Sequence, residues 1–184
     1  GGAMFAALLV QPASWAPSSL AHSPSSSVVR RARPCVAALE WEECNGCQLL
    51  RPQQGRPRAM VHFLGGVLVS PAPEVAYRYM LEQMAERGYL VVATPYAVDF
   101  DYRKPAAEIL DKFDGARSTL ANEYGGALPL LSLGHSLGAL MQTLLYCTYS
   151  DYAEACAGSA LVSWNNKPVS DAIPLFEQLF VPAF

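Results

Sequence analysis

From residue 41 onward, short apolar runs alternate with longer segments in which apolar residues recur every three or four positions. The short runs predict strands buried on both faces, over residues 59–64, 89–94, 129–133 and 159–163. The longer segments predict amphipathic helices, over residues 73–88, 106–124 and 137–149. Buried strands that alternate with helices predict the α/β class, in which a mostly parallel sheet is covered by helices on both faces.

Local signals mark the first of these predicted helices. Proline suits the first turn of a helix and glycine suits the position just after its end, which matches Pro73 and Gly88. Between these two residues, four apolar residues recur at helical spacing: Val75, Tyr79, Met80 and Met84. Their spacing is typical of a helix with one apolar face.

An Asn45-Gly46 pair separates two extended runs, residues 41–44 and 47–50. Asn-Gly between such runs is a strong signal for a two-residue β-hairpin. Cys44 and Cys47 would then be strand residues that flank the turn. A redox motif and half of a zinc site are the functional alternatives. No second Cys/His pair lies nearby, however, and no helix follows that would lower a thiol pKa, so the pattern favours the hairpin.

Residues 1–39 differ in composition from the rest of the chain. The segment contains no acidic residue, is rich in serine and alanine, and ends in a basic stretch that includes Arg30, Arg31 and Arg33. This composition is typical of an organelle transit peptide, and the serine content favours the chloroplast. We therefore expect a disordered leader over residues 1–39. A mitochondrial transit peptide, a secretory signal and an ordinary disordered tail of a cytoplasmic protein are the alternatives.

Charge and composition narrow the range of partners. A net charge of -3 over 184 residues gives no reason to expect a nucleic acid as partner. No apolar run approaches the roughly 18 residues that a transmembrane segment needs. The chain is 52% hydrophobic, so it can bury a substantial core. Its five cysteines are irregularly spaced, which favours free thiols in a reducing compartment. The sequence carries no signal for a cofactor, a metal or an oligomeric state.

Gly134, His135, Ser136, Leu137 and Gly138 follow the third predicted strand and open the third predicted helix. This arrangement is the pattern of a nucleophile elbow, a tight strained turn that lifts a serine above the sheet. The residues two before and two after the serine must be small, because the turn brings backbone against backbone. We expect Ser136 to be the nucleophile and the N–H of Leu137 to be one oxyanion donor. A glycine-flanked turn with an inert serine is the alternative.

A second oxyanion donor is expected in the loop after the strand over residues 59–64, where Gly65 and Gly66 stand in sequence. Glycines let the backbone approach a substrate oxygen closely, and we assign the donor to the N–H of Gly66. A plain strand-to-helix turn is the alternative.

The sequence offers no histidine base for this serine. In sites of this type an acid and then a histidine follow the serine along the chain, but His22, His62 and His135 all precede it. We expect His62 to brace a loop and His135, inside the elbow, to point away from the serine. Asp151 and Asp171 are expected in solvated loops. The catalytic triad is therefore incomplete in this chain.

Several short sequence segments together resemble the domain-of-unknown-function 1350 family, a plastid and cyanobacterial family of the α/β-hydrolase superfamily. They cover residues 61–66, 77–79, 87–89, 93–96, 100–101, 134–138, 163–166 and 173–174. The resemblance implies an α/β-hydrolase fold over residues 40–184, a plastid location in eukaryotes and a longer protein, whose last strands are absent here. It does not imply a substrate.

Two functions follow as expectations. The first is a serine esterase, lipase or thioesterase that acts on a small-molecule acyl or lipid substrate, with its acid and base beyond Phe184. The second is a non-catalytic binding or assembly factor in the plastid, which the missing histidine favours. Asn165 and Asn166 could border a pocket or form a turn, and the apolar residues 175–180 could begin a substrate cap or form a core helix. Expressed alone, the chain should expose an unpaired sheet edge and aggregate.

Overall fold

The computed structural model describes residues 39–99 and 101–164. The expected leader, Asn165, Asn166, Asp171 and the apolar residues 175–180 lie outside these ranges, apart from Leu39. The strands are β1 (Trp41–Cys44), β2 (Cys47–Leu50), β3 (Met60–Leu64), β4 (Leu90–Ala93), β5 (Leu130–His135) and β6 (Cys156–Val162). The helices are α1 (Pro73–Ala76), α2 (Arg78–Glu86), α3 (Arg103–Glu123), α4 (Leu137–Thr148) and α5 (Ser150–Ala155).

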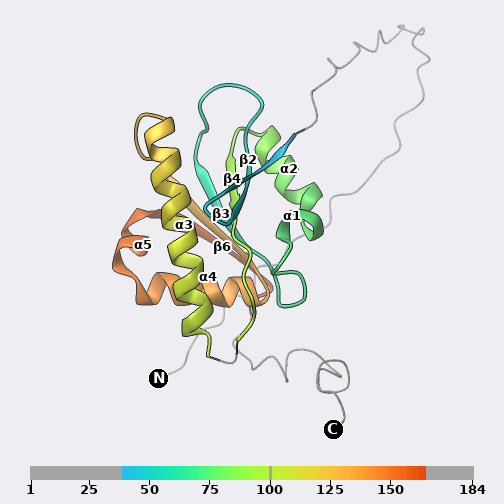
Figure 1. The fold of residues 1–184 in the computed structure, drawn as a ribbon, viewed down its shortest axis with the longest axis vertical. Helices are drawn as coiled ribbons and strands as arrows, with labels where there is room; N and C mark the ends of the chain where they lie inside the picture. Colours follow the sequence, from blue (N-terminus) through green and yellow to red (C-terminus); the bar gives the residue numbers. More distant parts are fainter. Residues whose placement is uncertain (1–38, 100, 165–184) are drawn as a thin grey trace, which may run out of the picture. The chain divides into compact units, whose positions relative to one another are not determined.

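The six strands form one sheet in the order β1-β2-β4-β3-β5-β6 (Figure 1). β4, β3, β5 and β6 run parallel to one another, while β2 is antiparallel to both β1 and β4. Helices connect the parallel strands, as a parallel sheet requires. The expected α/β class, a mostly parallel sheet with an initial β-hairpin, is confirmed.

The hairpin forms at Asn45-Gly46, as the sequence predicts. Both turn residues have positive φ, 52° for Asn45 and 75° for Gly46, which the tight two-residue turn requires. Cys44 and Cys47 pair directly across it, and both are free thiols. Cys47 is buried, so this residue serves as part of the core.

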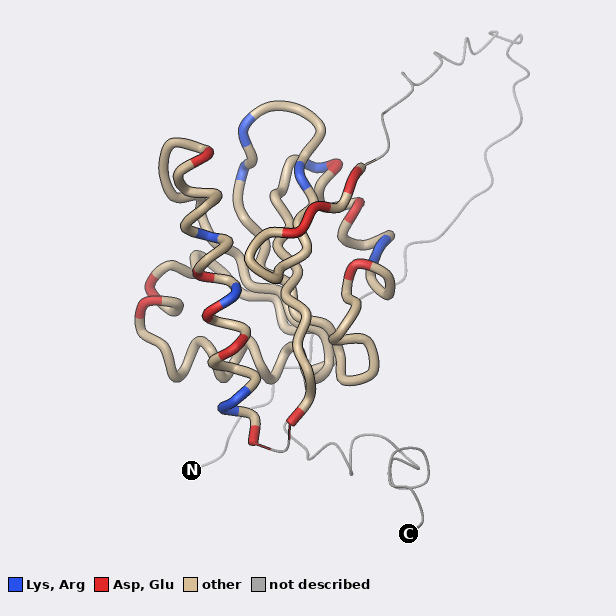
Figure 2. Tube along the Cα trace, viewed as in Figure 1, with Lys and Arg blue, Asp and Glu red and all other residues tan. Residues whose placement is uncertain are grey.

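The parallel strands are buried on both faces, and alternate residues of β3 point to opposite sides. Met60 and Leu64 join the core between the sheet and α3, α4 and α5. Val61 and Phe63 join the core between the sheet and α2. α3 buries one apolar face, and charged residues are spaced along its length (Figure 2).

The first predicted helix differs from expectation. It is broken at Tyr77, whose φ of -111° and ψ of 15° end α1 and precede α2. Of the four residues predicted to form its apolar face, Met80 and Met84 pack against the core, whereas the other two do not. Val75 is 72% exposed and Tyr79 is 77% exposed. The buried residues of α2 are instead Leu81 and Ala85.

The region after α4 also departs from the sequence prediction. α5 was not expected, and β6 begins at Cys156, three residues earlier than predicted. β6 is largely exposed instead of buried, with Leu161 at 43% and Val162 at 47%. Within the described part of the chain no strand pairs with its outer edge, so that edge lacks the neighbour that buries the other parallel strands.

Candidate active site

Ser136 lies at the sharp turn between β5 and α4. Its φ is 55° and its ψ is -119°, a backbone conformation that a residue with a side chain rarely adopts. Such strain persists only where the surrounding structure enforces it, and it is common at functional sites. The predicted turn between strand and helix is therefore present at the predicted residue.

Close backbone packing explains the two glycines of the elbow. A methyl group on Gly134 would lie 2.5 Å from the carbonyl oxygen of Gly138 and 2.6 Å from Cα of Ala139. A methyl group on Gly138 would collide with the carbonyl of Leu64 and would lie 2.6 Å from the carbonyl oxygen of Gly65. The elbow thus presses against its own helix and against the end of β3, which leaves no room for side chains at either glycine.

The register of the sheet brings three strand ends together. Leu64 at the end of β3 pairs with Gly134, and Gly134 pairs with Leu161 near the end of β6. The carboxyl ends of parallel strands meet at one edge of the sheet, which is where ligands bind in open α/β folds. Ser136 is fixed at this edge, because its N–H donates to the carbonyl of Val162 across 2.9 Å.

Leu137 is the first residue of α4, and its N–H has no acceptor among the described residues. The first N–H groups of a helix lack partners within the helix and carry partial positive charge. Because the N–H of Ser136 is already engaged, the N–H of Leu137 is the next backbone donor along the chain.

Gly66 lies beside the serine, as the sequence analysis expected, but its N–H is not free. A methyl group on Gly66 would lie 3.4 Å from Cβ of Ser136, so the loop after β3 borders the serine closely. The N–H of Gly66 donates to the hydroxyl of Tyr77 across 2.9 Å. Sequence reasoning missed Tyr77, because its only local signal is an aromatic residue within a predicted helix.

His135 of the elbow is held by the same tyrosine. Its Nδ1 lies 2.8 Å from the Tyr77 hydroxyl, and the two rings meet edge-on at a centroid distance of 5.7 Å. In the tautomer of His135 that carries its proton on Nε2, the Tyr77 oxygen accepts from the N–H of Gly66 and the tyrosine proton is directed to Nδ1 of His135. In this tautomer that nitrogen accepts from Tyr77 and is engaged by it.

His62 does not brace a loop, as had been expected, but lies fully buried within β3. Its ring stacks on Phe113 at a centroid distance of 3.8 Å. Burial, assisted by the positive charge of Arg117, lowers the pKa of His62 to about 3. The ring is thus neutral near pH 7, and it faces the helix layer of the core and not solvent.

Hydrogen bonds to His62 extend across the core in one direction. The hydroxyl of Tyr152 donates its only proton to Oε1 of Gln142 across 2.7 Å. The same hydroxyl therefore accepts from Nδ1–H of His62, also across 2.7 Å. Nε2 of His62 then accepts from Thr94 at 3.0 Å, and the Thr94 oxygen accepts from the Cys47 thiol at 3.3 Å. Nε2 of Gln142 donates to the backbone carbonyl of His62. The network satisfies its buried polar groups and makes His62 a structural residue.

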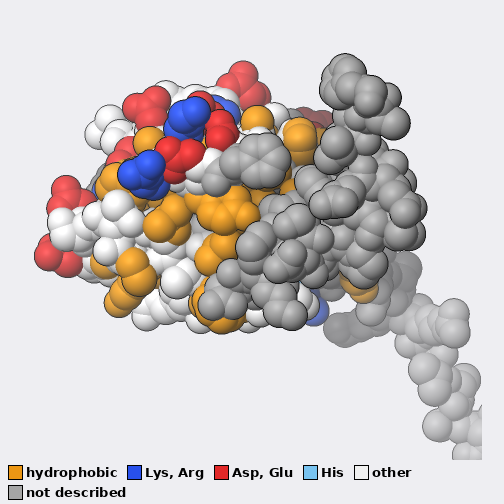
Figure 3. Space-filling view, turned by 90° about the horizontal axis from the view of Figure 1, so that it is seen from below, with side chains coloured by type: hydrophobic (Ala, Val, Ile, Leu, Met, Phe, Trp, Pro, Cys, Tyr) orange, Lys and Arg blue, Asp and Glu red, His pale blue; other side chains and the backbone are white. Residues whose placement is uncertain are grey.

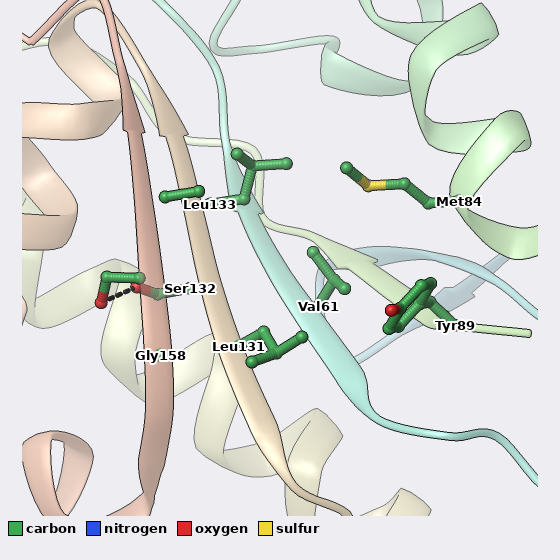
Figure 4. Close-up of a pocket in the computed structure, with 9 residues that line it drawn as sticks. Val61, Met84, Tyr89, Leu131, Ser132, Leu133 and Gly158 are labelled. Atoms are coloured by element: carbon green, nitrogen blue, oxygen red, sulfur yellow. Dashed lines mark hydrogen bonds between the residues drawn. The ribbon is translucent and has the colours of Figure 1, made fainter. Parts of the chain in front are cut away.

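An apolar groove of about 410 Å³ lies on the α2 side of the sheet (Figure 4). Val61, Leu131 and Leu133 project from the strands toward Met84 and Tyr89. Gly158, Ser159 and Ala160 of β6 complete its wall, together with Ser132, whose hydroxyl donates to that of Ser159. These residues precede the ends of their strands, so this groove is separate from the edge that carries Ser136.

Two further features of the site concern ions and membranes. Within residues 39–99 and 101–164, no three His, Cys, Asp or Glu residues are placed to hold a metal ion. Over the same residues, no helix is both long enough and apolar enough to cross a bilayer.

Comparison with solved structures identifies the fold. Esterase B from Lactobacillus Rhamnosis aligns with a TM-score of 0.54 and 20% identity, over 69% of this chain and 48% of that one. A bacterial heroin esterase aligns with a TM-score of 0.52 and 16% identity, over 67% of this chain and 43% of that one. A hormone-sensitive lipase from a metagenome library aligns with a TM-score of 0.52 and 14% identity, over 73% of this chain and 47% of that one.

These identities are low, so the similarity shows a shared fold, and the chain spans less than half the length of each of the three structures. No curated protein sequence matches the chain. The family model described as "Protein of unknown function (DUF1350)" matches residues 40–183. With this match over most of its length, and with the sheet and elbow described above, the chain belongs to the DUF1350 family and has the α/β-hydrolase fold.

Proposed function

We propose that Ser136 is the nucleophile of a serine hydrolase that cleaves an ester or thioester bond in an apolar acyl substrate. The observation that carries the proposal is the backbone of Ser136, held at a φ of 55° directly between β5 and α4. An inert serine would gain nothing from this strain, whereas a nucleophile gains exposure at the sheet edge and a helix N-terminus beside it.

The chemistry requires a base that takes the serine proton as Oγ attacks the acyl carbon. His62 is excluded from this role by its burial and by the hydrogen bonds at both of its ring nitrogens. Nδ1 of His135 accepts from Tyr77. The proposal therefore places the acid and the base outside the described residues.

Apolar side chains at the same sheet edge support an apolar acyl substrate. Leu68 follows β3 and is 60% exposed, Val98 follows β4 and is 41% exposed, and Trp164 follows β6 and is 46% exposed. Hydrophobic side chains also make up much of the visible surface seen from below (Figure 3). Binding sites for small molecules are lined mainly by such groups, with a few polar groups that fix orientation.

A fluorophosphonate probe tests the proposal, because it reacts only with an activated serine. Full-length folded protein should be labelled, and Ser136→Ala should abolish labelling. Ser132→Ala is a matched control from the same strand, since the Ser132 hydroxyl donates to Ser159 within the sheet. Equal labelling of the wild type and Ser136→Ala, or no labelling of folded wild type, would rule out a serine hydrolase.

A non-catalytic binding or assembly role is the second candidate function. It is favoured by the commitment of both described histidines to structural hydrogen bonds, at His62 and at His135. The same labelling experiment separates the two candidates, since a binding factor would keep its fold and remain unlabelled.

A further inference from the structure

The peptide unit that joins Gly65 and Gly66 is held at both ends by tyrosine hydroxyls. The hydroxyl of Tyr96, a buried residue, donates to the carbonyl of Gly65 at 2.6 Å. On the other side of the peptide, the N–H of Gly66 donates to the hydroxyl of Tyr77 at 2.9 Å. The peptide cannot turn freely, and the N–H that the sequence offers as an oxyanion donor is already occupied.

The Tyr77 hydroxyl is itself firmly placed. Its ring packs edge-on against Phe63 at a centroid distance of 4.7 Å and against His135 at 5.7 Å. The oxygen accepts from Gly66 and its proton is directed to Nδ1 of His135 at 2.8 Å. A rotation of the O–H bond alone, without movement of the ring, would redirect that proton.

The hydroxyl and the serine border the same small space. The position that a methyl group on Gly66 would occupy lies 3.3 Å from Oη of Tyr77 and 3.4 Å from Cβ of Ser136. The same position lies 3.4 Å from Nδ1 of His135. The Tyr77 hydroxyl and the Ser136 side chain therefore flank Gly66 on the same side, and an oxygen atom bound between them is within reach of the Tyr77 hydroxyl.

We propose that the Tyr77 hydroxyl, and not the N–H of Gly66, is the second oxyanion donor beside the N–H of Leu137. The inference rests on the hydrolase function proposed above. As Oγ of Ser136 bonds to the acyl carbon, the carbonyl π electrons move onto the oxygen, and the Tyr77 O–H turns from His135 to that oxygen and keeps its proton. The oxyanion electrons then re-form the carbonyl as the bond between the acyl carbon and the leaving oxygen or sulfur breaks, and the serine proton passes through the general base to that leaving atom. Donation from Gly66 to the tyrosine oxygen polarises the O–H bond and strengthens its donation.

Replacement of Tyr77 by Phe tests the inference, because the two candidate donors predict opposite changes in the labelling rate of Ser136. The variant keeps the ring, removes the hydroxyl and frees the N–H of Gly66. We expect the rate of fluorophosphonate labelling of Ser136 to fall by about 10²-fold, as for the loss of one oxyanion donor. If Gly66 were the donor and Tyr77 merely occupied it, labelling would become faster. Tyr79→Phe is the matched control, because Tyr79 lies two residues later in α2 and is 77% exposed, so this variant should be labelled at the wild-type rate.

A second substitution at position 77 distinguishes loss of the hydroxyl from loss of structure as the cause of slower labelling in Tyr77→Phe. 3-Fluorotyrosine at position 77, measured at pH 6, retains the hydroxyl and makes it a stronger donor, so labelling should be faster than in the wild type. A labelling rate that is unchanged in both variants, or raised in Tyr77→Phe, would overturn the role of Tyr77 while leaving Ser136 as the nucleophile. Absence of labelling in folded wild type would overturn both proposals.

Discussion

The N–H of Ser136 donates to the carbonyl oxygen of Val162 across 2.9 Å, so the end of β6 holds the elbow that follows β5. The chain turns sharply just after this contact, because Ser163 has a φ of 51°. The geometry of the candidate nucleophile thus depends on a residue 26 positions later in the sequence.

Substitution of Ser163 should reveal this dependence. Proline requires a φ near -65°, so Ser163→Pro cannot make the turn, and we expect a loss of about 2–3 kcal/mol of stability with a large drop in labelling of Ser136. Ser163→Gly accepts the positive φ and should remain within about 1 kcal/mol of the wild type. Urea unfolding and fluorophosphonate labelling of both variants provide the measurement. Normal labelling of Ser163→Pro would contradict the dependence.

The elbow glycines should tolerate no methyl group. At Gly138 an alanine would collide with the backbone of Leu64, so we expect Gly138→Ala to cost about 3 kcal/mol or more in unfolding free energy. Gly125→Ala is the control, since Gly125 has a φ of 66° and open space around it, and backbone strain alone should cost about 1–2 kcal/mol. A cost for Gly138→Ala no larger than the control would argue against close packing at the elbow.

Buried His62 should make stability depend on pH. Its pKa is lowered by burial to about 3 in the folded protein, against 6.5 for the exposed side chain. Between these values the unfolded chain binds a proton that the folded protein does not. Stability should therefore be full above pH 6.5 and fall as the pH decreases toward 3, by up to about 1.4 kcal/mol per pH unit.

The measurement is guanidinium unfolding between pH 7 and pH 4 for the wild type and for His62→Gln. Carboxylates titrate in the same window, so the difference in slope between the two proteins isolates His62. Parallel curves for the wild type and His62→Gln would show that His62 does not carry the effect.

Cys47 should be chemically inert while the protein is folded. Burial raises the pKa of its thiol to about 11. At pH 8 we expect iodoacetamide to modify the exposed Cys147 readily and to modify Cys47 only after unfolding. Peptide mass spectrometry resolves the two sites. Rapid alkylation of Cys47, or a disulfide to Cys44, would restore the redox interpretation of the pair.

The sequence by itself determined the features that depend on neighbours in the chain. Asn45-Gly46 specified the hairpin because only a few residues accept positive φ in adjacent positions. The alternation of buried strands and helices specified a parallel α/β sheet. Gly134 and Gly138 around Ser136 specified the elbow, since a tight strand-to-helix turn has a local spacing requirement.

Tertiary structure decided what depends on contacts between distant segments. Val75 and Tyr79 have the spacing of a buried face, but both are exposed, while Met80 and Met84 pack against the core. The strand order and the exposed edge of β6 follow from long-range pairing, which leaves no local pattern. The hydrogen bonds of Tyr77 to Gly66 and His135 join residues 11 and 58 positions away, and only folding brings that hydroxyl to the serine.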